Sequence, residues 1–342
     1  MPGQPSRQVY THFGLEVYQS LPVRGVWRLQ TPRGDKCLKR SQLPYVDILF
    51  AYHAIEHLHR HGFDRVPRFQ PTITGKPFLQ LNGTCYILSD WIEGQECDYT
   101  RPEDLARATW TLAELHLAAH GFQPPLNCAD KMRWGQWPSI FRHRRQELLY
   151  FRHRIESGLD RSPTGRYYHK HLPHFLSQSN IALALLAGSR YQSLVKVEQK
   201  QQLFCHHDFA HHNVLLTPGG RTYVVDFDYA ICDLRLHDVG SLIIRALKLN
   251  DWDYRVADFV LATYNQVYPL PVEALPVMLA FFYFPQDFWQ VGVWLYLEQV
   301  TWPNRAVERK LERTIRMEKK RIRFLQHFAG LVGRNTSNIV EH

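Results

Sequence analysis

Apolar and polar residues alternate along the chain between residues 15 and 40. This period of two is typical of half-buried strands, and the turn signal Pro-Arg-Gly-Asp at 32–35 separates the third strand from the first two. Two more strands are expected at 77–80 and 84–89, because Asn82-Gly83 between them is a preferred two-residue hairpin turn. The pattern therefore predicts a small antiparallel sheet, preceded by a polar and loose segment at 1–13.

Elsewhere the apolar residues recur every three or four positions, which predicts helices. One helix is expected at 44–61, and a second at 101–120 begins with a capping box at Thr100 and Glu103 and stops at Gly121. The remaining helices are expected at 139–157, 172–197, 252–267, 272–283, 285–300 and 303–328. The last has an apolar stripe opposite Arg, Lys and Glu, as a surface helix does, and we interpret its basic face as solvated.

One segment, residues 204–228, has a different pattern and reads FCHHDFAHHNVLLTPGGRTYVVDFD. It predicts a loop followed by a hairpin whose two short strands flank the turn Pro218-Gly219-Gly220. Polar side chains precede the first strand and follow the second. A hairpin between them would fix their separation.

These polar residues have the spacing H-x-D-x-x-x-x-N, followed by an Asp thirteen residues later. The order resembles the catalytic loop and the metal-binding Asp of the protein-kinase-like fold. Phosphoryl transfer needs a carboxylate that orients the acceptor hydroxyl, and Asp208 fits this role. Asn213 and Asp226 fit the second requirement, which is oxygen ligands that hold Mg²⁺ against the phosphates.

Two other interpretations of the segment stay open. His206, His207, His211 and His212 could form a zinc site, since His207 and His211 have the spacing of one helical turn. Alternatively, the Asp and Asn residues only cap turns. We favour the phosphate-binding interpretation because the strand that follows leaves little room for a helix, and because four polar positions match together.

The kinase-like pattern also gives roles to residues closer to the N-terminus. Lys39, at the end of the third strand, would contact the α- and β-phosphates of a nucleotide. A carboxylate on the following helix would hold this lysine; Asp47 and Glu56 are the acids available there, and we favour Glu56. A hinge would bind adenine through its backbone at Ser89, Asp90, Trp91 and Ile92.

Three further features bear on this interpretation. The loop between the first two strands has one glycine, Gly25, where a glycine-rich loop would let backbone N–H groups approach phosphate, and Arg24 is the cation that could compensate. His116 is interpreted as a core histidine. Asp238 could cap the helix that follows it, and in a kinase-like site this acid also braces the catalytic loop.

Composition narrows the classes of partner. A net charge of +9 with 19 histidines favours acidic ligands, among them polyphosphates. The basic residues lie on helices mixed with Glu, as at 142–147, and no recognition motif accompanies them, which argues against nucleic acid. No apolar run is long enough for a membrane span, and residues 1–13 lack the core of a secretory signal. We therefore expect cytosolic synthesis and no membrane partner.

The six cysteines are scattered along the chain, at 37, 85, 97, 128, 205 and 232, with no C-x-x-C pair among them. We interpret them as buried small hydrophobic residues rather than as disulfides or zinc ligands.

Three segments resemble the spore coat protein S family: HHDFAHHNVLL, VVDFDYAICDLRLHDVGSLIIRALK and FPQDFWQVGVWLYLEQ. This family lies within the aminoglycoside phosphotransferase and choline kinase superfamily. The resemblance implies an α+β, protein-kinase-like fold of two lobes, with a small antiparallel β-sheet in the N-lobe and a large, mostly helical C-lobe. We expect a nucleotide-binding lobe at 1–92, a helical lobe with the loop and hairpin at 93–330, and a disordered tail at 331–342.

The resemblance also implies roles for single residues. The matching positions are Asp208 for the catalytic Asp, His206 for the histidine that buttresses its loop, Asn213, Asp226 and Asp228 for the metal-binding acids and amide, and Lys39 for the nucleotide-anchoring lysine. His207 departs from the small residue, usually glycine, that aminoglycoside kinases have at this position. This departure argues against an antibiotic substrate.

The family implies ATP and Mg²⁺ as cofactors and leaves three functions open. The first is a phosphotransferase that acts on a small molecule or a coat component, and the second is a coat-assembly protein that keeps the kinase fold as a scaffold. The third is an aminoglycoside or choline kinase. We favour at least nucleotide binding because Asp208, Asn213 and Asp226 are retained together. The family also implies synthesis in the mother cell of a spore-former and deposition in the spore coat with other coat proteins.

Overall fold

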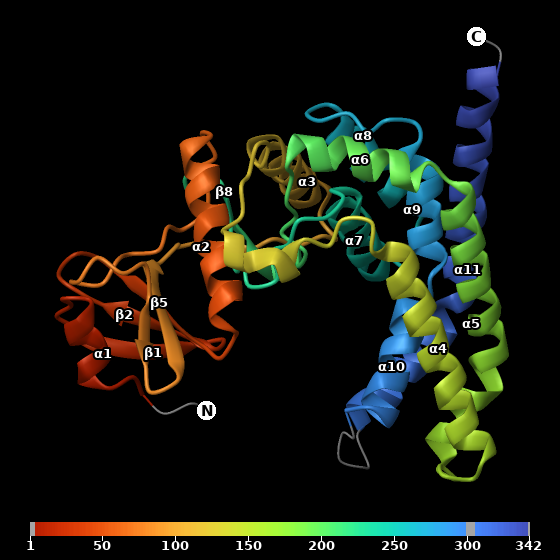
Figure 1. Ribbon diagram of the computed structural model, residues 1–342, viewed down its shortest axis with the longest axis horizontal. Helices are drawn as coiled ribbons and strands as arrows, with labels where there is room; N and C mark the ends of the chain where they lie inside the picture. The colour runs from red at the N-terminus through yellow and green to blue at the C-terminus, as the bar shows by residue number, and fades with distance from the viewer. Residues whose placement is uncertain (1–3, 299–304, 341–342) are drawn as a thin grey trace. The chain divides into compact units, whose positions relative to one another are not determined.

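The computed structural model describes residues 4–298 and 305–340, and of 335–340 only the backbone. The chain divides into two compact units (Figure 1). Unit 1 comprises Met1–Arg133 and Gln201–Asp238, and unit 2 comprises Trp134–Lys200 and Val239–His342. The loop and hairpin therefore belong to the same unit as the N-terminal sheet, whereas the boundary expected at residue 92 would separate them.

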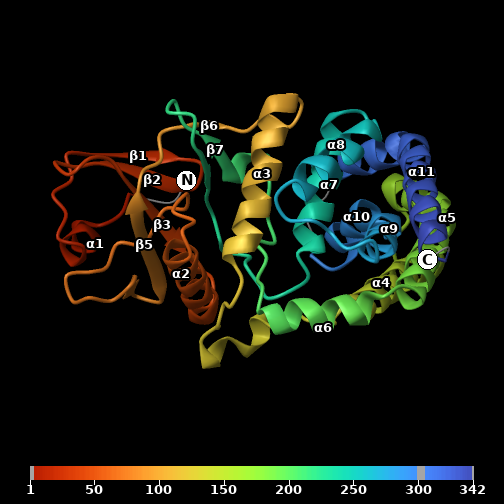
Figure 2. The same cartoon turned by 90° about the horizontal axis from the view of Figure 1, so that it is seen from above.

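Unit 1 contains a five-stranded antiparallel sheet with the order β1-β2-β3-β5-β4. Four of these strands, β1, β2, β3 and β5, are labelled in Figure 2. Its strands are β1 (Gln19–Val23), β2 (Val26–Gln30), β3 (Lys36–Ser41), β4 (Leu79–Leu81) and β5 (Thr84–Asp90). The alternation of apolar residues and the turn signals thus predicted every strand of this sheet. Both central residues of the hairpin turn, Asn82 and Gly83, have positive φ angles of 50° and 72°, as such a turn requires.

The two faces of this sheet bury different residues. Trp27, Leu38 and Leu88 lie side by side across three strands and form a core with Val9. Val9 belongs to the short helix α1 (Arg7–His12), so part of the segment that we expected to be loose is folded. On the other face, helix α2 (Tyr45–Arg60) contributes Ile48 to a second cluster with Cys85 and Ile87.

A second, three-stranded sheet of unit 1 has the order β6-β7-β8. The predicted hairpin is β7 (Val214–Leu216) and β8 (Thr222–Val224), and β6 (Gln95–Glu96), which the sequence did not reveal, pairs with β7. Gly94 precedes β6 and approaches the chain closely, since a Cβ atom there would lie 3.0 Å from the carbonyl oxygen of Leu216. The pairing therefore fixes the hairpin to the chain that leaves the first sheet.

Three further segments of unit 1 are helical: α3 (Pro102–Ala118) and the 3-10 helices η1 (Leu126–Lys131) and η2 (His211–Asn213). Helix α3 was predicted, but its expected capping box is wrong. Its N-cap is Arg101, and the Thr100 hydroxyl donates instead to Asp98 at 2.7 Å.

Unit 2 is built from helices, of which α7 starts in unit 1 (Figure 1). They are α4 (Trp137–Glu156), α5 (Pro163–Gly188), α6 (Tyr191–Gln201), α7 (Leu236–Leu249), α8 (Arg255–Asn265), α9 (Ala274–Tyr283), α10 (Gln286–Tyr296) and α11 (Arg305–Val340). Its core contains stacked rings: Phe288 lies 4.1 Å from Tyr168 and 4.0 Å from Phe175, centroid to centroid. Within the described residues, no helix is both long and apolar enough to cross a membrane.

Two helix predictions in unit 2 differ from the structure. The single helix expected at 172–197 is two helices, since α5 ends at Gly188 and α6 begins at Tyr191. Helix α5 also begins earlier than expected, at Pro163, and contains Pro173 in its interior. Proline normally marks a first turn, which explains the late start that we expected. Helix α11 continues past residue 328 to Val340, through the segment expected to be a disordered tail. Residues 299–304, which include the expected end of one helix and start of the next, lie outside the described residues.

Candidate active site

The loop before the hairpin is held by its own polar groups. The Asn213 side chain donates through Nδ2 to the backbone oxygen of Asp208 at 2.9 Å and to its carboxylate at 3.3 Å. The backbone N–H of Val225 donates to the Asn213 carbonyl at 2.9 Å, so the two ends of the hairpin are joined. Asn213 is therefore fixed between Asp208 and the strand that leads to Asp226.

The predicted lysine reaches the acids that follow the hairpin. The Lys39 ammonium lies 2.6 Å from an oxygen of Asp226 and 2.7 Å from an oxygen of Asp228. Lys39 stands on β3 opposite Ile87 of β5, on the face of the sheet that packs against α2. Residues that are 187 positions apart in the sequence thus meet in one cluster of charges.

Burial and charge act in opposite directions on this cluster. Burial alone would lower the pKa of Lys39, but the attraction of Asp226 and Asp228 outweighs it and the pKa is raised. Burial alone would raise the pKa of Asp226, but Lys39 outweighs it and the pKa is lowered. For Asp228, burial and the neighbouring Asp226 charge prevail over Lys39, so its pKa is raised. Asp226 is therefore the carboxylate that stays ionised most readily.

The backbone is left-handed at two positions of the site. Asp226 has a φ of 66° and His207 a φ of 67°. Non-glycine residues adopt this conformation rarely and at a cost of about 1–2 kcal/mol, and such strain concentrates at functional sites. His207 directly precedes Asp208, and Asp226 begins the Asp226–Asp228 segment. The strain therefore lies where the sequence predicts the chemistry.

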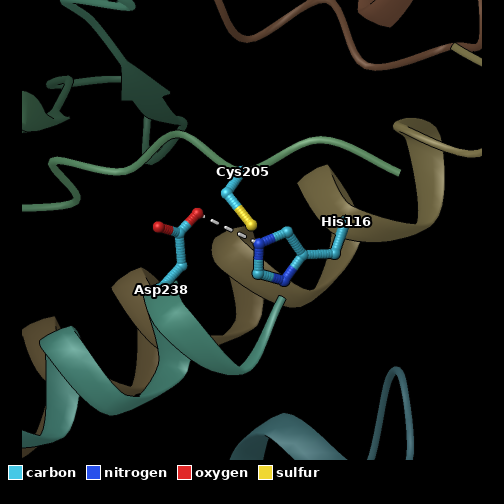
Figure 3. Close-up of side chains that lie close together, drawn as sticks. All are labelled: His116, Cys205 and Asp238. Carbon is cyan, nitrogen blue, oxygen red and sulfur yellow. Dashed lines mark hydrogen bonds and ion pairs between the residues drawn. The ribbon is translucent and has the colours of Figure 1, made fainter. Parts of the chain in front are cut away.

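A buried carboxylate on α7 holds the loop in this conformation. Asp238 accepts the backbone N–H of His206 at 2.7 Å and that of His207 at 2.9 Å, while His116 of α3 lies 3.2 Å from the same carboxylate (Figure 3). The ring of His206 continues the connection, since its Nε2 lies 3.0 Å from the carbonyl oxygen of Val225. Asp238 thus braces the loop instead of capping the helix, and His206 links the loop to the residue before Asp226.

Burial sets the charges of this bracing group. Burial alone would raise the pKa of Asp238, but the hydrogen bond from His116 and the nearby ring of His237, 3.6 Å away, outweigh it and hold the pKa well below its usual value. Burial lowers the pKa of His116 more than Asp238 raises it, so the ring is neutral and donates Nε2–H to the carboxylate. The loop is therefore held by an ionised acceptor with three donors around it.

His116, Cys205 and Asp238 also bring potential metal-ligand atoms within 4.8 Å of one another (Figure 3). The Asp238 oxygens already accept the two backbone N–H groups, and the Cys205 thiol donates to the carbonyl oxygens of Asp233 and Leu234 at 3.3 and 3.2 Å. We therefore interpret this group as a hydrogen-bonded core. In the part of the chain that the structure describes, it is the only group of three or more His, Cys, Asp or Glu ligands, so the histidines at 206, 207, 211 and 212 do not form one.

The expected ion pair between Lys39 and Glu56 is wrong. Glu56 instead accepts two hydrogen bonds from the guanidinium of Arg68, one of them at 2.9 Å. Asp47, the other acid considered on α2, lies 2.9 Å from Lys131. Both acids of the helix are paired with cations from outside the helix, which no local pattern indicates, and Asp226 and Asp228 lie beside Lys39 in their place.

The residues expected to form the hinge lie at the end of β5 and just beyond it. Ser89 is buried in the strand, whereas Asp90 accepts from Lys36 at 2.5 Å and from Gln70 at 2.7 Å. The backbone N–H of Trp91 donates to the backbone carbonyl oxygen of Asp35 at 3.1 Å, and Ile92 is half-buried. These contacts order the segment, and its role in adenine binding stays a prediction.

The loop expected to cover phosphate is a tight turn. Arg24 and Gly25, with φ angles of 46° and 88°, are the only residues between β1 and β2. The Arg24 guanidinium pairs with Glu96 of β6. Such a turn offers few backbone N–H groups to a phosphate, and its cation is already engaged.

Sequence reasoning missed two neighbours of the loop that precedes the hairpin. His237 stacks on His207 with ring centroids 3.9 Å apart, and His116 was assigned only to the core. The one sequence signal for the first is its place directly before Asp238, the acid that was expected to brace the loop. No sequence signal pairs His116 with an acid 122 positions away.

The donor set fits a hard divalent cation. Asp226 and Asp228 offer carboxylate oxygens, and Asn213 is oriented by its Nδ2 bonds so that its Oδ1 is the atom available as a ligand. Magnesium prefers such oxygen ligands and takes only one or two from protein, with phosphate oxygens supplying others. The residues are therefore compatible with Mg²⁺ and a nucleotide.

Comparisons with known proteins agree with this geometry. A family model described as "Phosphotransferase enzyme family" matches residues 23–278. Spore coat protein S of Bacillus subtilis (strain 168) is 27% identical over 304 residues, which cover 88% of this chain and 86% of that protein.

Solved structures of similar fold are phosphotransferases. An aminoglycoside phosphotransferase from Alicyclobacillus acidocaldarius has a TM-score of 0.84 at 19% identity, with 98% of each chain covered. A spectinomycin phosphotransferase in complex with ADP and spectinomycin has a TM-score of 0.62 at 15% identity, covering 95% of this chain and all of that one. The predicted kinase-like α+β fold, with a small antiparallel sheet and a mostly helical remainder, is confirmed. With its model matched over residues 23–278, the chain belongs to the phosphotransferase enzyme family.

Proposed function

We propose that this protein binds ATP with Mg²⁺ and transfers the γ-phosphoryl group to a hydroxyl acceptor. The observation that carries the proposal is the contact of the Lys39 ammonium with both Asp226 and Asp228. A cation that anchors phosphates beside carboxylates that hold Mg²⁺ is the arrangement that phosphoryl transfer needs. A similar fold crystallised with ADP supports the choice of nucleotide.

Each residue then has a defined task. Lys39 attracts the phosphates, while Asn213, Asp226 and Asp228 are the groups that would hold the metal. Mg²⁺, when bound, neutralises charge on the phosphates and helps to orient them. Asp208 accepts the proton of the acceptor hydroxyl. The hydroxyl oxygen bonds to the γ-phosphorus while the bond between that phosphorus and ADP breaks. Asp238 and His206 keep Asp208 in place through the loop backbone.

Similarity to spore coat protein S supports a place for this protein in the spore coat, after synthesis in the mother cell of a spore-former. The acceptor would then be a coat component or a small molecule. His207 stands beside Asp208 with its ring stacked on His237. This bulk next to the proposed catalytic carboxylate argues against an aminoglycoside acceptor.

The experiment is thermal unfolding of the purified protein with and without Mg²⁺ and a non-hydrolysable ATP analogue. Binding at one hundred times Kd should add about 2.7 kcal/mol of stability. The shift should disappear in Asp226→Ala. It should persist in Asp208→Asn, which should lose phosphoryl transfer because Asp208 acts on the acceptor and not on the nucleotide. Absence of any shift in the wild type at millimolar nucleotide would refute the proposal.

A second candidate is a coat-assembly scaffold that keeps the fold without catalysis. The observation in its favour is the tight turn at Arg24 and Gly25, which leaves little backbone to cover a phosphate. A scaffold would fold normally and assemble, yet show neither the nucleotide shift nor its loss in Asp226→Ala.

A further inference from the structure

The outward side of helix α11 carries a row of cations. We define this basic stripe by its exposed members, Arg305, Arg309, Arg316, Lys319 and Arg323. They follow one another at steps of three, four and seven residues, so they lie on one side of the helix. At a rise of about 1.5 Å per residue the stripe is about 27 Å long. The opposite side of α11 packs on α9 and α10 through buried residues such as Leu311 and Phe324.

Three other cations of the same helix are paired with carboxylates. Lys310 lies 2.8 Å from Asp287, Lys320 pairs with Asp251, and Arg321 lies 3.2 Å from Glu318. Within the described side chains, residues 4–298 and 305–334, no carboxylate pairs with any member of the basic stripe. The helix therefore neutralises these three cations and leaves the members of the basic stripe available.

The charges of the stripe are unbalanced along its own length. Glu312 is the only acid in the row, between Arg309 and Arg316. Like charges three or four residues apart on a helix repel one another, so Arg305 with Arg309, and Lys319 with Arg316 and Arg323, disfavour the free state. A bound polyanion would relieve this repulsion. A second copy of this chain is a poor candidate because its net charge is +9.

We propose that the basic stripe docks an acidic segment of a partner polypeptide. The stripe is one row of side chains, and an extended chain of about eight residues spans the same length. A nucleic-acid duplex offers phosphates on two strands, whereas the stripe is a single row of cations. Among the described side chains of α11, residues 305–334, no large apolar residue is exposed, which leaves nothing to insert into a bilayer. This inference is independent of the proposed nucleotide site.

The test measures binding of a fluorescein-labelled glutamate peptide of about eight residues to the full chain, by anisotropy at about 0.1 M salt. The stripe variant is Arg309→Gln/Arg316→Gln/Arg323→Gln. The control, Arg142→Gln/Lys196→Gln/Lys200→Gln, removes the same charge from exposed positions on α4 and α6. Glutamine keeps a high helix propensity, and circular dichroism checks that both variants are folded.

We expect the stripe variant to bind the peptide at least tenfold more weakly than wild type, with a shallower dependence on salt, and the control variant to change affinity less than threefold. Equal losses in both variants would show that only net charge matters and would overturn the proposal. A duplex DNA oligonucleotide or anionic vesicles that bind the wild type more tightly than the peptide, and lose that binding in the stripe variant, would overturn it too.

Discussion

Asp238→Asn is the substitution that probes most sharply how the loop before the hairpin is braced. The carboxylate accepts the backbone N–H groups of His206 and His207, and His116 donates to it as well. An asparagine of the same shape has one acceptor oxygen, and its NH₂ group would face one of these donors. One buried N–H loses its acceptor, at about 1–3 kcal/mol, and the other bonds lose their charge assistance. The expected loss is about 3 kcal/mol, a large part of the 5–15 kcal/mol typical of whole proteins.

The assay is urea unfolding followed by tryptophan fluorescence, with Asp253→Asn as the matched control. Asp253 also accepts a backbone N–H, that of Arg255 at 3.1 Å, but it lies at the surface, where water can replace the lost acceptor. The control should lose less than about 1 kcal/mol. An Asp238→Asn loss no larger than that of the control would refute the bracing role.

The pH dependence gives a second readout of the same group. The pKa of Asp238 is lower in the folded state than its ordinary value, so the folded state binds fewer protons. Its contribution to stability is therefore present above the unfolded pKa of about 3.9 and is lost as the pH falls toward the folded pKa. The stability difference between wild type and Asp238→Asn should be constant above about pH 5 and should shrink below about pH 4. A difference that grew on acidification would contradict an ionised carboxylate.

Three other predictions concern the core, the pH response of α2 and the nucleotide anchor. Gly292→Ala should destabilise unit 2 by about 2 kcal/mol in urea unfolding, because the added Cβ would overlap the Phe151 ring, whereas Gly188→Ala, with nothing within 4 Å, should lose nothing. Burial lowers the pKa of His57 to about 4, so below about pH 6.5 the unfolded state binds a proton that the folded state disfavours. Between about pH 7 and pH 5 the free energy of unfolding of the wild type should therefore fall by about 2 kcal/mol more than that of His57→Gln. Equal losses would contradict this. Lys39→Met should weaken ADP binding at least tenfold, about 1.4 kcal/mol, in calorimetry, and an unchanged affinity would exclude a phosphate contact.

Local signals predicted the elements that local chemistry controls. Asn82-Gly83 predicted a hairpin because few residue pairs accept two positive φ angles, and the alternation before residue 40 predicted three strands. The start of α5 was predicted too late, near Pro173, because proline is typical of the first turn of a helix and here lies in its interior. The two-residue strand β6 carries too few residues for any period to be visible.

The candidate site was predictable only where a spaced motif carried it. The order of Asp208, Asn213 and Asp226 follows from their short separation in one segment. The partner of Lys39 did not, since Glu56 and Asp226 are equally suitable acids until the fold decides which one is near. Ion pairs across more than a hundred positions depend on tertiary packing, which a single sequence does not encode locally.

The central claim is that Asp226, beside Lys39, holds the metal of a bound nucleotide. Isothermal titration of ADP into the protein, with and without Mg²⁺, tests it most directly in the wild type, in Asp226→Asn and in the exposed control Asp64→Asn. Mg²⁺ should strengthen ADP binding at least tenfold in the wild type and in the control, and it should have no such effect in Asp226→Asn. An equal response to Mg²⁺ in all three proteins, or no ADP binding to any of them, would contradict the account.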